Sequence, residues 1–201
     1  IRQYRTTQSG SGMTAPEIEP LLQSMDLNFR PVDLQFGPDG ALYVADWYNP
    51  IIQHGEIGVR DPARDHIRGR IWRIRYKSKK LLAPVDLTKL DIEQVLDELK
   101  VYEDRIRYRV RIRLSELPEN EVLSALEKWI NKLNPDDIDF EQNRMEGLWV
   151  YQQFNRPNEN LLNELLKSKN YRVRAAATRV LFYWRDQIKN AQDKLIFMSR
   201  D

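Results

Sequence analysis

The side chains that could do chemistry gather in one segment of this sequence, between residues 46 and 70. Both histidines of the chain lie in it, among many arginines and aspartates. Guanidinium and imidazole groups can hold an anionic carboxylate, while aspartates orient them. The candidate ligand-binding residues are therefore His54, Arg60, Asp61, Arg64, Asp65, His66 and Arg70.

A structural role competes with this interpretation. The acidic and basic side chains could pair with one another only to keep a long loop rigid. The acids in question are Asp46, Asp61 and Asp65, and the bases are Arg60, Arg64 and Arg70.

Metal binding and nucleophilic catalysis receive no support. His54, Asp61, Asp65 and His66 carry atoms that bind zinc or calcium, but their spacing matches no known ligand pattern. The sequence has no cysteine, which excludes disulfides, thiolate sites and the haem-attachment motif Cys-x-x-Cys-His. It also has no G-x-S-x-G motif, so we assign no catalytic residue and no metal ligand.

Three predicted β-strands must position the charged segment. Residues 31–36 and 41–46 alternate apolar and polar side chains at period two, with the turn Pro38-Asp39-Gly40 between them. Residues 69–76 supply a third strand. The charged segment is then the long connection from the second strand to the third. Three antiparallel strands are most of one β-propeller blade, whose faces need further structure to cover them.

A family resemblance rests on this region. The run RPVDLQFGPDGALYVADWYNPII, followed by HG, RDPxRDH and GRIWRI, resembles the last propeller segment of large secreted bacterial proteins. These are the membrane-bound dehydrogenases, or haem-binding CxxCH proteins, whose first half is similar to quinone-dependent glucose and sorbosone dehydrogenases. Their order is a β-propeller, then HEAT-type helical repeats, then a c-type cytochrome module. The resemblance covers about residues 30–184, but Ile67-Arg68 replaces the Thr-His that the family commonly has.

The resemblance implies several properties. The chain would be periplasmic or extracellular, and its partners would be the remaining propeller blades and a cytochrome c module. Pyrroloquinoline quinone and haem c would lie elsewhere in the full-length protein, with no cofactor in this chain.

Composition sets the broader class. The 201 residues are 41% hydrophobic and 31% charged, which is enough apolar material for a real core. Because 32 basic and 30 acidic residues nearly cancel, nucleic-acid binding receives no support. No apolar run approaches the roughly 18 residues of a membrane span. The chain starts at Ile1 without a Met or signal sequence, so we expect a fragment or processed piece.

The ends of the chain follow different patterns. Residues 1–12 predict an edge strand or frayed end, and residues 14–23 a capped short helix. From residue 84 onward the apolar period is helical, with Asp91 and Asp104 at the starts of the first helices. Further helices are predicted over residues 118–133, 139–154, 161–166, 171–184 and 189–198.

An internal repeat links these helices. Arg105-Ile106-Arg107 and Arg172-Val173-Arg174 each open a helix, and they lie about two solenoid repeats apart. We therefore predict about three helical hairpins stacked as HEAT-like repeats. The arginines from Arg105 to Arg113 lie at alternate positions, so they cannot share one helix face. They are expected to pair with Glu98, Glu103, Asp104 and Glu116, while Trp129, Trp149, Tyr151 and Trp184 are expected in the core.

The predicted fold class is mainly α with a small antiparallel β part. Residues 1–83 would form a propeller-type blade or meander, and residues 84–201 a HEAT-like repeat domain. The first functional hypothesis is a non-catalytic part of a secreted, quinone-dependent sugar or alcohol oxidoreductase of cytochrome type. The alternative is a protein interaction scaffold without enzymatic activity, binding a partner on a helical face. A carbohydrate-binding surface built on Trp47 and Tyr48 is a third hypothesis.

Overall fold

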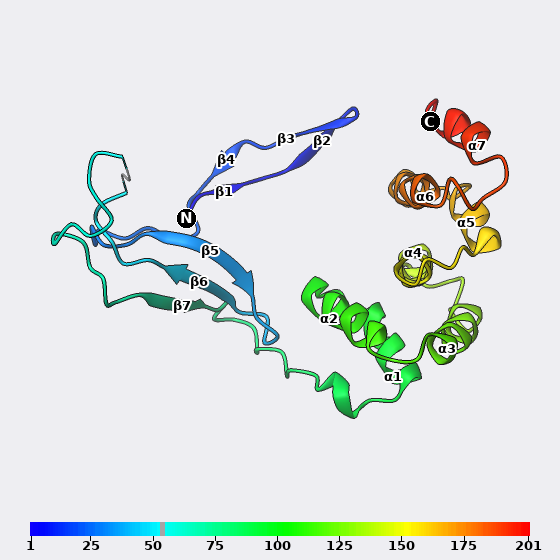
Figure 1. Cartoon of the computed structure of the whole chain (residues 1–201), viewed down its shortest axis with the longest axis horizontal. Helices are drawn as coiled ribbons and strands as arrows, with labels where there is room; N and C mark the ends of the chain where they lie inside the picture. Colours follow the sequence, from blue (N-terminus) through cyan, green and yellow to red (C-terminus); the bar gives the residue numbers. More distant parts are fainter. Residues whose placement is uncertain (53–54) are drawn as a thin grey trace. The chain divides into compact units, whose positions relative to one another are not determined.

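The computed structural model describes residues 1–52 and 55–201, and combines helices with small antiparallel sheets. His54, a candidate ligand residue, lies outside the described residues. The chain divides into two compact units, Ile1–Ala83 and Pro84–Asp201 (Figure 1). Across the described part of the chain, no helix is long and apolar enough to cross a membrane.

The first unit opens with a thin, two-part ribbon. Strand β1 (Gln3–Tyr4) pairs with β4 (Glu17–Ile18), and β2 (Thr7–Ser9) pairs with β3 (Gly12–Thr14). The helix predicted over residues 14–23 is therefore wrong. Pro20 would have removed a hydrogen bond from the interior of that helix, whereas an extended strand lets Pro16 O accept from Arg5 N at 3.0 Å.

The three strands predicted around the charged segment are confirmed. They are β5 (Pro31–Phe36), β6 (Leu42–Asp46) and β7 (Arg70–Ile74), and they form one antiparallel sheet in the order β5-β6-β7. The turn between β5 and β6 contains Gly40 at a φ of 75°, a backbone conformation that side chains disfavour. Asp39 stabilises this turn by accepting a hydrogen bond from Ala41 N at 3.1 Å.

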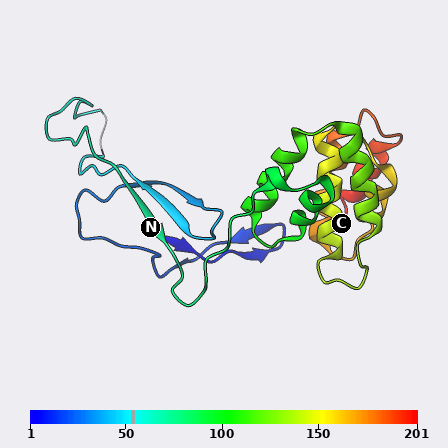
Figure 2. The ribbon, with the colours of Figure 1, turned by 90° about the horizontal axis from the view of Figure 1, so that it is seen from below.

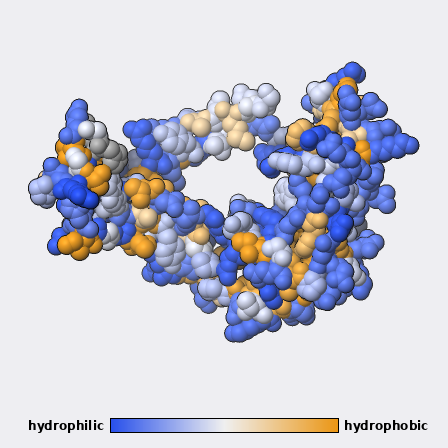
Figure 3. Space-filling view, viewed as in Figure 1, coloured by the Kyte–Doolittle hydropathy of each residue, from blue (hydrophilic) through white to orange (hydrophobic). Residues whose placement is uncertain are grey.

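One face of this sheet is apolar and partly open. Leu34, Val44 and Trp72 are cross-strand partners, so their side chains share a face. Val44 is fully buried, but Leu34 remains 41% exposed and the neighbouring Phe36 57%. Hydrophobic atoms accordingly reach the surface of this unit in the space-filling view (Figure 3). Three strands are too few to enclose such a face by themselves.

The second unit is helical, and its predicted helices are confirmed. They are α1 (Ile92–Asp97), α2 (Asp104–Ser115), α3 (Glu119–Asn131), α4 (Phe140–Gln153), α5 (Glu159–Leu165), α6 (Tyr171–Tyr183) and α7 (Ala191–Met198). Two short 3-10 turns, η1 (Leu87–Lys89) and η2 (Glu98–Lys100), lie near the start. Asp91 caps α1, as predicted, and it does so in a capping box with Gln94. Glu103, rather than Asp104, caps α2 by accepting from Ile106 N at 2.7 Å.

One hydrophobic core runs through the helical unit, whose helices lie packed side by side (Figure 2). Helix α4 is central, because it packs against α3, α5 and α6. It approaches α3 closely at Gly147, where an added Cβ would lie 2.8 Å from Ile130 Cδ1. The expected core positions of Trp129, Tyr151 and Trp184 are confirmed, with 5%, 8% and 1% of each residue exposed. Trp149, also expected in the core, is only partly buried and packs against it.

Candidate functional site

The charged segment is a loop that is closed at its base by one cross-strand pair, Asp46 and Arg70. Arg70 Nε donates to Asp46 Oδ2 at 2.8 Å, and Trp72 Nε1 donates to the same oxygen at 2.8 Å. The other oxygen, Oδ1, accepts from the backbone N–H groups of Arg30 and Tyr48 at 2.8 and 3.0 Å. The buried carboxylate therefore ties both ends of the loop and the start of β5 together.

These contacts set the ionisation of Asp46. Burial opposes the charged form, but the hydrogen bonds from Trp72, Arg30 and Tyr48 and the Arg70 guanidinium outweigh it. They hold the pKa of Asp46 below its usual range. Arg70 is itself held by Asp26, at 2.6 Å, and lies 4.3 Å from the ring centre of Tyr48. The Asp46–Arg70 pair is thus a structural clamp that holds the two ends of the loop together.

Arg64 also has a structural role. Its guanidinium is buried and donates to the backbone carbonyls of Ile51, Ile57 and Gly58 at 2.9, 3.0 and 3.0 Å. It also lies 5.9 Å from the ring centre of Trp47. Because one guanidinium donates to the carbonyls of residues 51, 57 and 58, it links the first part of the loop to its middle.

The loop aspartates bind backbone groups rather than distant arginines. Asp61 Oδ1 accepts from Ala63 N at 2.8 Å, and Asp65 Oδ1 accepts from Ile67 N and Arg68 N, both at 2.9 Å. Those two backbone hydrogen bonds lower the pKa of Asp65, and the Arg68 guanidinium, 3.2 Å from Oδ2, adds to the effect. Of the proposed acid–base pairings, the structure forms Asp46 with Arg70, while Asp61 and Asp65 stabilise local turns.

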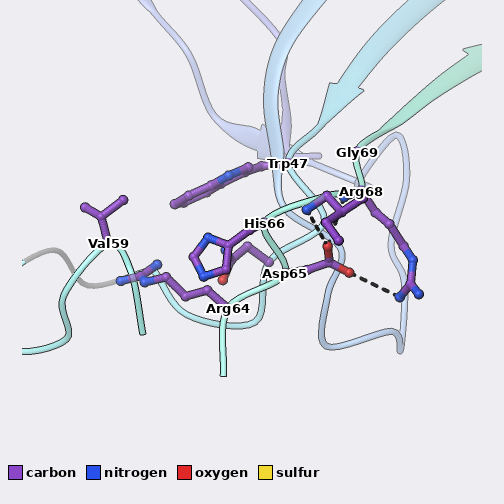
Figure 4. Close-up of a pocket in the computed structure, with 9 residues that line it drawn as sticks. Trp47, Val59, Arg64, Asp65, His66, Arg68 and Gly69 are labelled. Atoms are coloured by element: carbon purple, nitrogen blue, oxygen red, sulfur yellow. Dashed lines mark hydrogen bonds and ion pairs between the residues drawn. The ribbon is translucent and has the colours of Figure 1, made fainter. Parts of the chain in front are cut away.

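A pocket of about 400 Å³ lies within the loop. Its lining consists of Trp47, Asn49, Val59, Arg64, Asp65, His66, Ile67, Arg68 and Gly69. Figure 4 shows the rings of Trp47 and His66 facing the same space, with Arg64 beside them and Arg68 paired to Asp65. His66 is exposed and its Nε2 lies 3.0 Å from Asp61 O.

The pocket brings together only part of the candidate set. Arg64, Asp65 and His66 line it, whereas Arg60, Asp61 and Arg70 lie outside its lining. Trp47 and Arg68 line it although they were not in the ligand-binding set. The density of arginine and aromatic residues pointed to this loop, but only the backbone path decides which of them face the pocket.

The pocket lining combines two arginines, a histidine and one carboxylate with an aromatic wall. Arg68 is the exposed cation, with 73% of its side chain accessible, and Trp47 offers a flat apolar ring. Within residues 1–52 and 55–201, no cluster of three or more His, Cys, Asp or Glu residues could hold a metal ion. The exposed Arg68 guanidinium can pair with an anionic group.

A second polar cluster joins α2 to α4. Glu146 of α4 is 1% exposed, and it pairs with Arg107 Nε at 3.2 Å and with the Arg111 guanidinium. Burial raises the pKa of Glu146, while the two arginines act in the opposite direction. The expected pairs Arg107 with Asp104 and Arg113 with Glu116 also form, but the link to Glu146 was missed. The signal for it was Glu146 as the one charged residue within residues 145–151 of α4, which are otherwise apolar or aromatic apart from Gly147.

Comparisons with known proteins add one match. The model of a family described as a domain of unknown function (DUF7133) matches residues 1–78, which contain the sheet and its loop. No curated protein matches the chain. No solved structure matches it.

Proposed function

We propose that this chain is a non-catalytic part of a larger, secreted dehydrogenase-like protein of cytochrome type. That protein would oxidise a sugar or similar alcohol at a quinone cofactor and pass the electrons to haem c. The sheet unit would be one propeller-type blade, and the helices would form HEAT-like repeats. The resemblance of about residues 30–184 to that family supports this proposal, and it implies a periplasmic or extracellular setting.

The observation that carries the proposal is the open apolar face of the β5-β6-β7 sheet. Leu34 and Phe36 are 41% and 57% exposed beside the fully buried Val44, and Trp72 is 40% exposed. An exposed apolar face of this kind usually marks a contact surface. Neighbouring blades of a propeller would cover it with apolar side chains of their own sheets.

Pyrroloquinoline quinone carries carboxylates on a flat ring system, so its chemistry can be compared with the loop pocket. Arg64 is committed to backbone carbonyls. Arg68 pairs with Asp65 but stays exposed, and exposed His66 lines the same pocket with Trp47. These residues could hold one carboxylate edge of the cofactor. A proton-accepting base and the rest of the site would lie in other blades.

Calorimetric titration with pyrroloquinoline quinone and calcium tests this proposal, on the chain alone and on the full-length gene product. Arg68→Ala tests the pocket, and Arg60→Ala is the matched control, because Arg60 is exposed in the same loop but outside the pocket lining. Binding that weakens at least tenfold in Arg68→Ala alone would support the pocket as a quinone contact. If the full-length protein binds equally well with Arg68→Ala and with Arg60→Ala, the site would lie in other blades. No binding by either protein would rule out the quinone role.

The second candidate function is a protein interaction scaffold with no enzymatic activity. A specific observation favours it, namely that α2 exposes apolar side chains beside its arginines. Tyr108 and Ile112, one turn apart, are 52% and 44% exposed, and the preceding Tyr102 is 99% exposed. A partner such as the cytochrome module could bind this helical face. Tyr108→Ser with Ile112→Ser should then abolish capture of the isolated module without changing the helical circular dichroism.

A further inference from the structure

Arg107 of α2 and Arg174 of α6 occupy equivalent positions in the helical unit. Arg107 Nη1 donates to the carbonyls of Val101 and Tyr102, six and five residues earlier, at 2.9 and 3.1 Å. Arg174 Nη1 donates to the carbonyls six and five residues earlier in the same way, at 2.8 and 3.3 Å. Each arginine therefore satisfies the carbonyls at the end of the preceding segment.

On α2, this arginine also marks the place where the next helix docks. Arg107 and Arg111 lie one turn apart and both reach the buried Glu146 of α4. Gln153 of α4 donates to Arg111 O at 2.9 Å, which extends the contact along the helices. Helix α4 also packs on α3, where Ile130 meets Gly147. Its docking therefore uses a buried carboxylate on one helix and an apolar contact on the other.

Helices α6 and α7 present the same two elements, an arginine and apolar side chains, but here the apolar side chains are exposed. Arg174 pairs with Asp201, which lies beyond α7 and keeps 37% of its side chain exposed. Phe182, two turns after Arg174 on α6, is 51% exposed. On α7, Ile196 and Phe197 are 48% and 73% exposed. Figure 1 shows α6 and α7 adjacent to each other at the end of this unit.

We propose that this end surface, formed by Arg174, Phe182, Ile196 and Phe197, is a docking site for an amphipathic helix that presents a carboxylate. The carboxylate would replace Asp201 as the ion-pair partner of Arg174, just as Glu146 pairs with the equivalent arginine of α2, Arg107. Apolar side chains of the incoming helix would cover Phe182 and Phe197, as α4 covers Ile130. Stacked helical arrays are stabilised by such contacts between neighbouring helices. The inference concerns the surface of α6 and α7 and does not depend on the proposed quinone or scaffold roles.

Helix α4 itself is the best probe for this surface, because it already satisfies the equivalent site. The full chain is extended after Asp201 by a second copy of residues 135–154, which contains the segment before α4 and α4. A matched extension carries Glu146→Gln in the appended copy only. Thermal unfolding and hydrogen exchange of α6 and α7 are measured for the unextended chain and for both extended chains.

The glutamate extension should raise the melting temperature by about 5 °C and slow exchange in α6 and α7. The glutamine extension should raise it clearly less. In an Arg174→Ala background the difference between the two extensions should vanish, whereas in an Arg172→Ala background it should persist, because Arg172 lies outside this surface. Unchanged stability and exchange with the glutamate extension would overturn the proposal. Equal gains from both extensions would overturn the role given to Arg174.

Discussion

Arg70 donates from Nε to Oδ2 of Asp46 at 2.8 Å, across the last residue pair of β6 and β7. These two residues begin and end the long loop, so one ion pair fixes the distance between its ends. Trp72 binds the same carboxylate oxygen, which leaves the Asp46 side chain fully buried. The loop pocket is therefore built on a clamp that belongs to the sheet.

Replacing Asp46 should weaken the sheet unit more than replacing any exposed aspartate. Asp46→Ala removes the acceptor for two side chains and two backbone N–H groups, so we expect a loss of about 3 kcal/mol. Hydrogen exchange of the β6 amides measures the effect. Asp33→Ala, at an exposed position on β5, is the control and should change stability by less than about 0.5 kcal/mol. Equal effects of the two changes would contradict the clamp.

Acid should destabilise the sheet unit through Asp46 and Asp39. Burial opposes ionisation of Asp39, but hydrogen bonds from Ala41, Arg73 and Tyr43 lower its pKa, as the corresponding contacts do for Asp46. A carboxyl with a lowered pKa in the folded state contributes stability above its unfolded pKa of about 3.9. That stability is lost as the pH falls through the folded pKa.

Urea midpoints of the sheet unit between pH 7 and pH 2.5 measure this dependence. The midpoint should stay level down to about pH 4.5 and then decline. In Asp39→Asn the decline should be shallower, since one of the carboxyls with a lowered pKa no longer titrates. A decline of the same slope in both proteins would exclude Asp39 as a contributor.

Glu146 should be essential to the packing of α2 on α4. Glu146→Ala leaves Arg111 and Arg107 without their buried acceptor, and we expect a loss of about 3 kcal/mol. Glu127→Ala on α3 is the control, because Glu127 is an exposed glutamate within a helix. Chemical unfolding followed by helical circular dichroism compares the variants. If the Glu127 variant is as unstable as the Glu146 variant, helix propensity rather than the buried contact is responsible.

A methyl group at Gly147 should disturb the α3–α4 contact. Alanine favours a helix by about 1 kcal/mol over glycine, but its Cβ would lie 2.8 Å from Ile130 Cδ1 and 2.9 Å from Cγ1. We expect overpacking to outweigh propensity, with a net loss of about 1 kcal/mol. A double-mutant cycle with Ile130→Ala tests the cause. The double variant should be at least about 1 kcal/mol more stable than the sum of the single changes predicts.

The cap of α1 offers a matched pair of substitutions. Asp91→Ala removes the acceptor for Gln94 N at 2.8 Å and should lower stability by about 1 kcal/mol. Asp91→Asn keeps a good capping side chain, so it should stay close to the parent protein. Thermal unfolding of the three proteins checks both expectations. An equal drop in both variants would point to lost charge instead of a lost cap.

Local patterns predicted most elements of this fold. Alternation along residues 31–36 and 41–46, and the helical spacing of Ile92, Val95 and Leu96, each follow from a periodicity that short-range geometry imposes. The failure over residues 14–23 has a physical reason. Thr14 and Pro16 are favourable at a helix start, but Pro20 is not tolerated inside the helix and pairing with β1 satisfies the backbone instead.

The candidate site was only partly predictable. The loop was recognised from its charges and aromatics, and the pairing of Asp46 with Arg70 was among the pairs considered. The roles of Arg64, Asp61 and Asp65 were not, because a hydrogen bond to a backbone carbonyl or N–H has no signature in residue type. Which side chains line the pocket depends on the path of the loop between two fixed ends.

The amino-acid sequence by itself determined strands β5, β6 and β7, the helices, the cap of α1 and the region of dense charge, since these depend on residues close together along the chain. Only the tertiary structure decided that Asp46 is buried as a four-donor acceptor, that Glu146 links α2 to α4, and that Arg174 repeats the contacts of Arg107. Each of these depends on groups brought together from distant positions. Their energies come from burial and exact hydrogen-bond geometry, which exist only once the chain has folded.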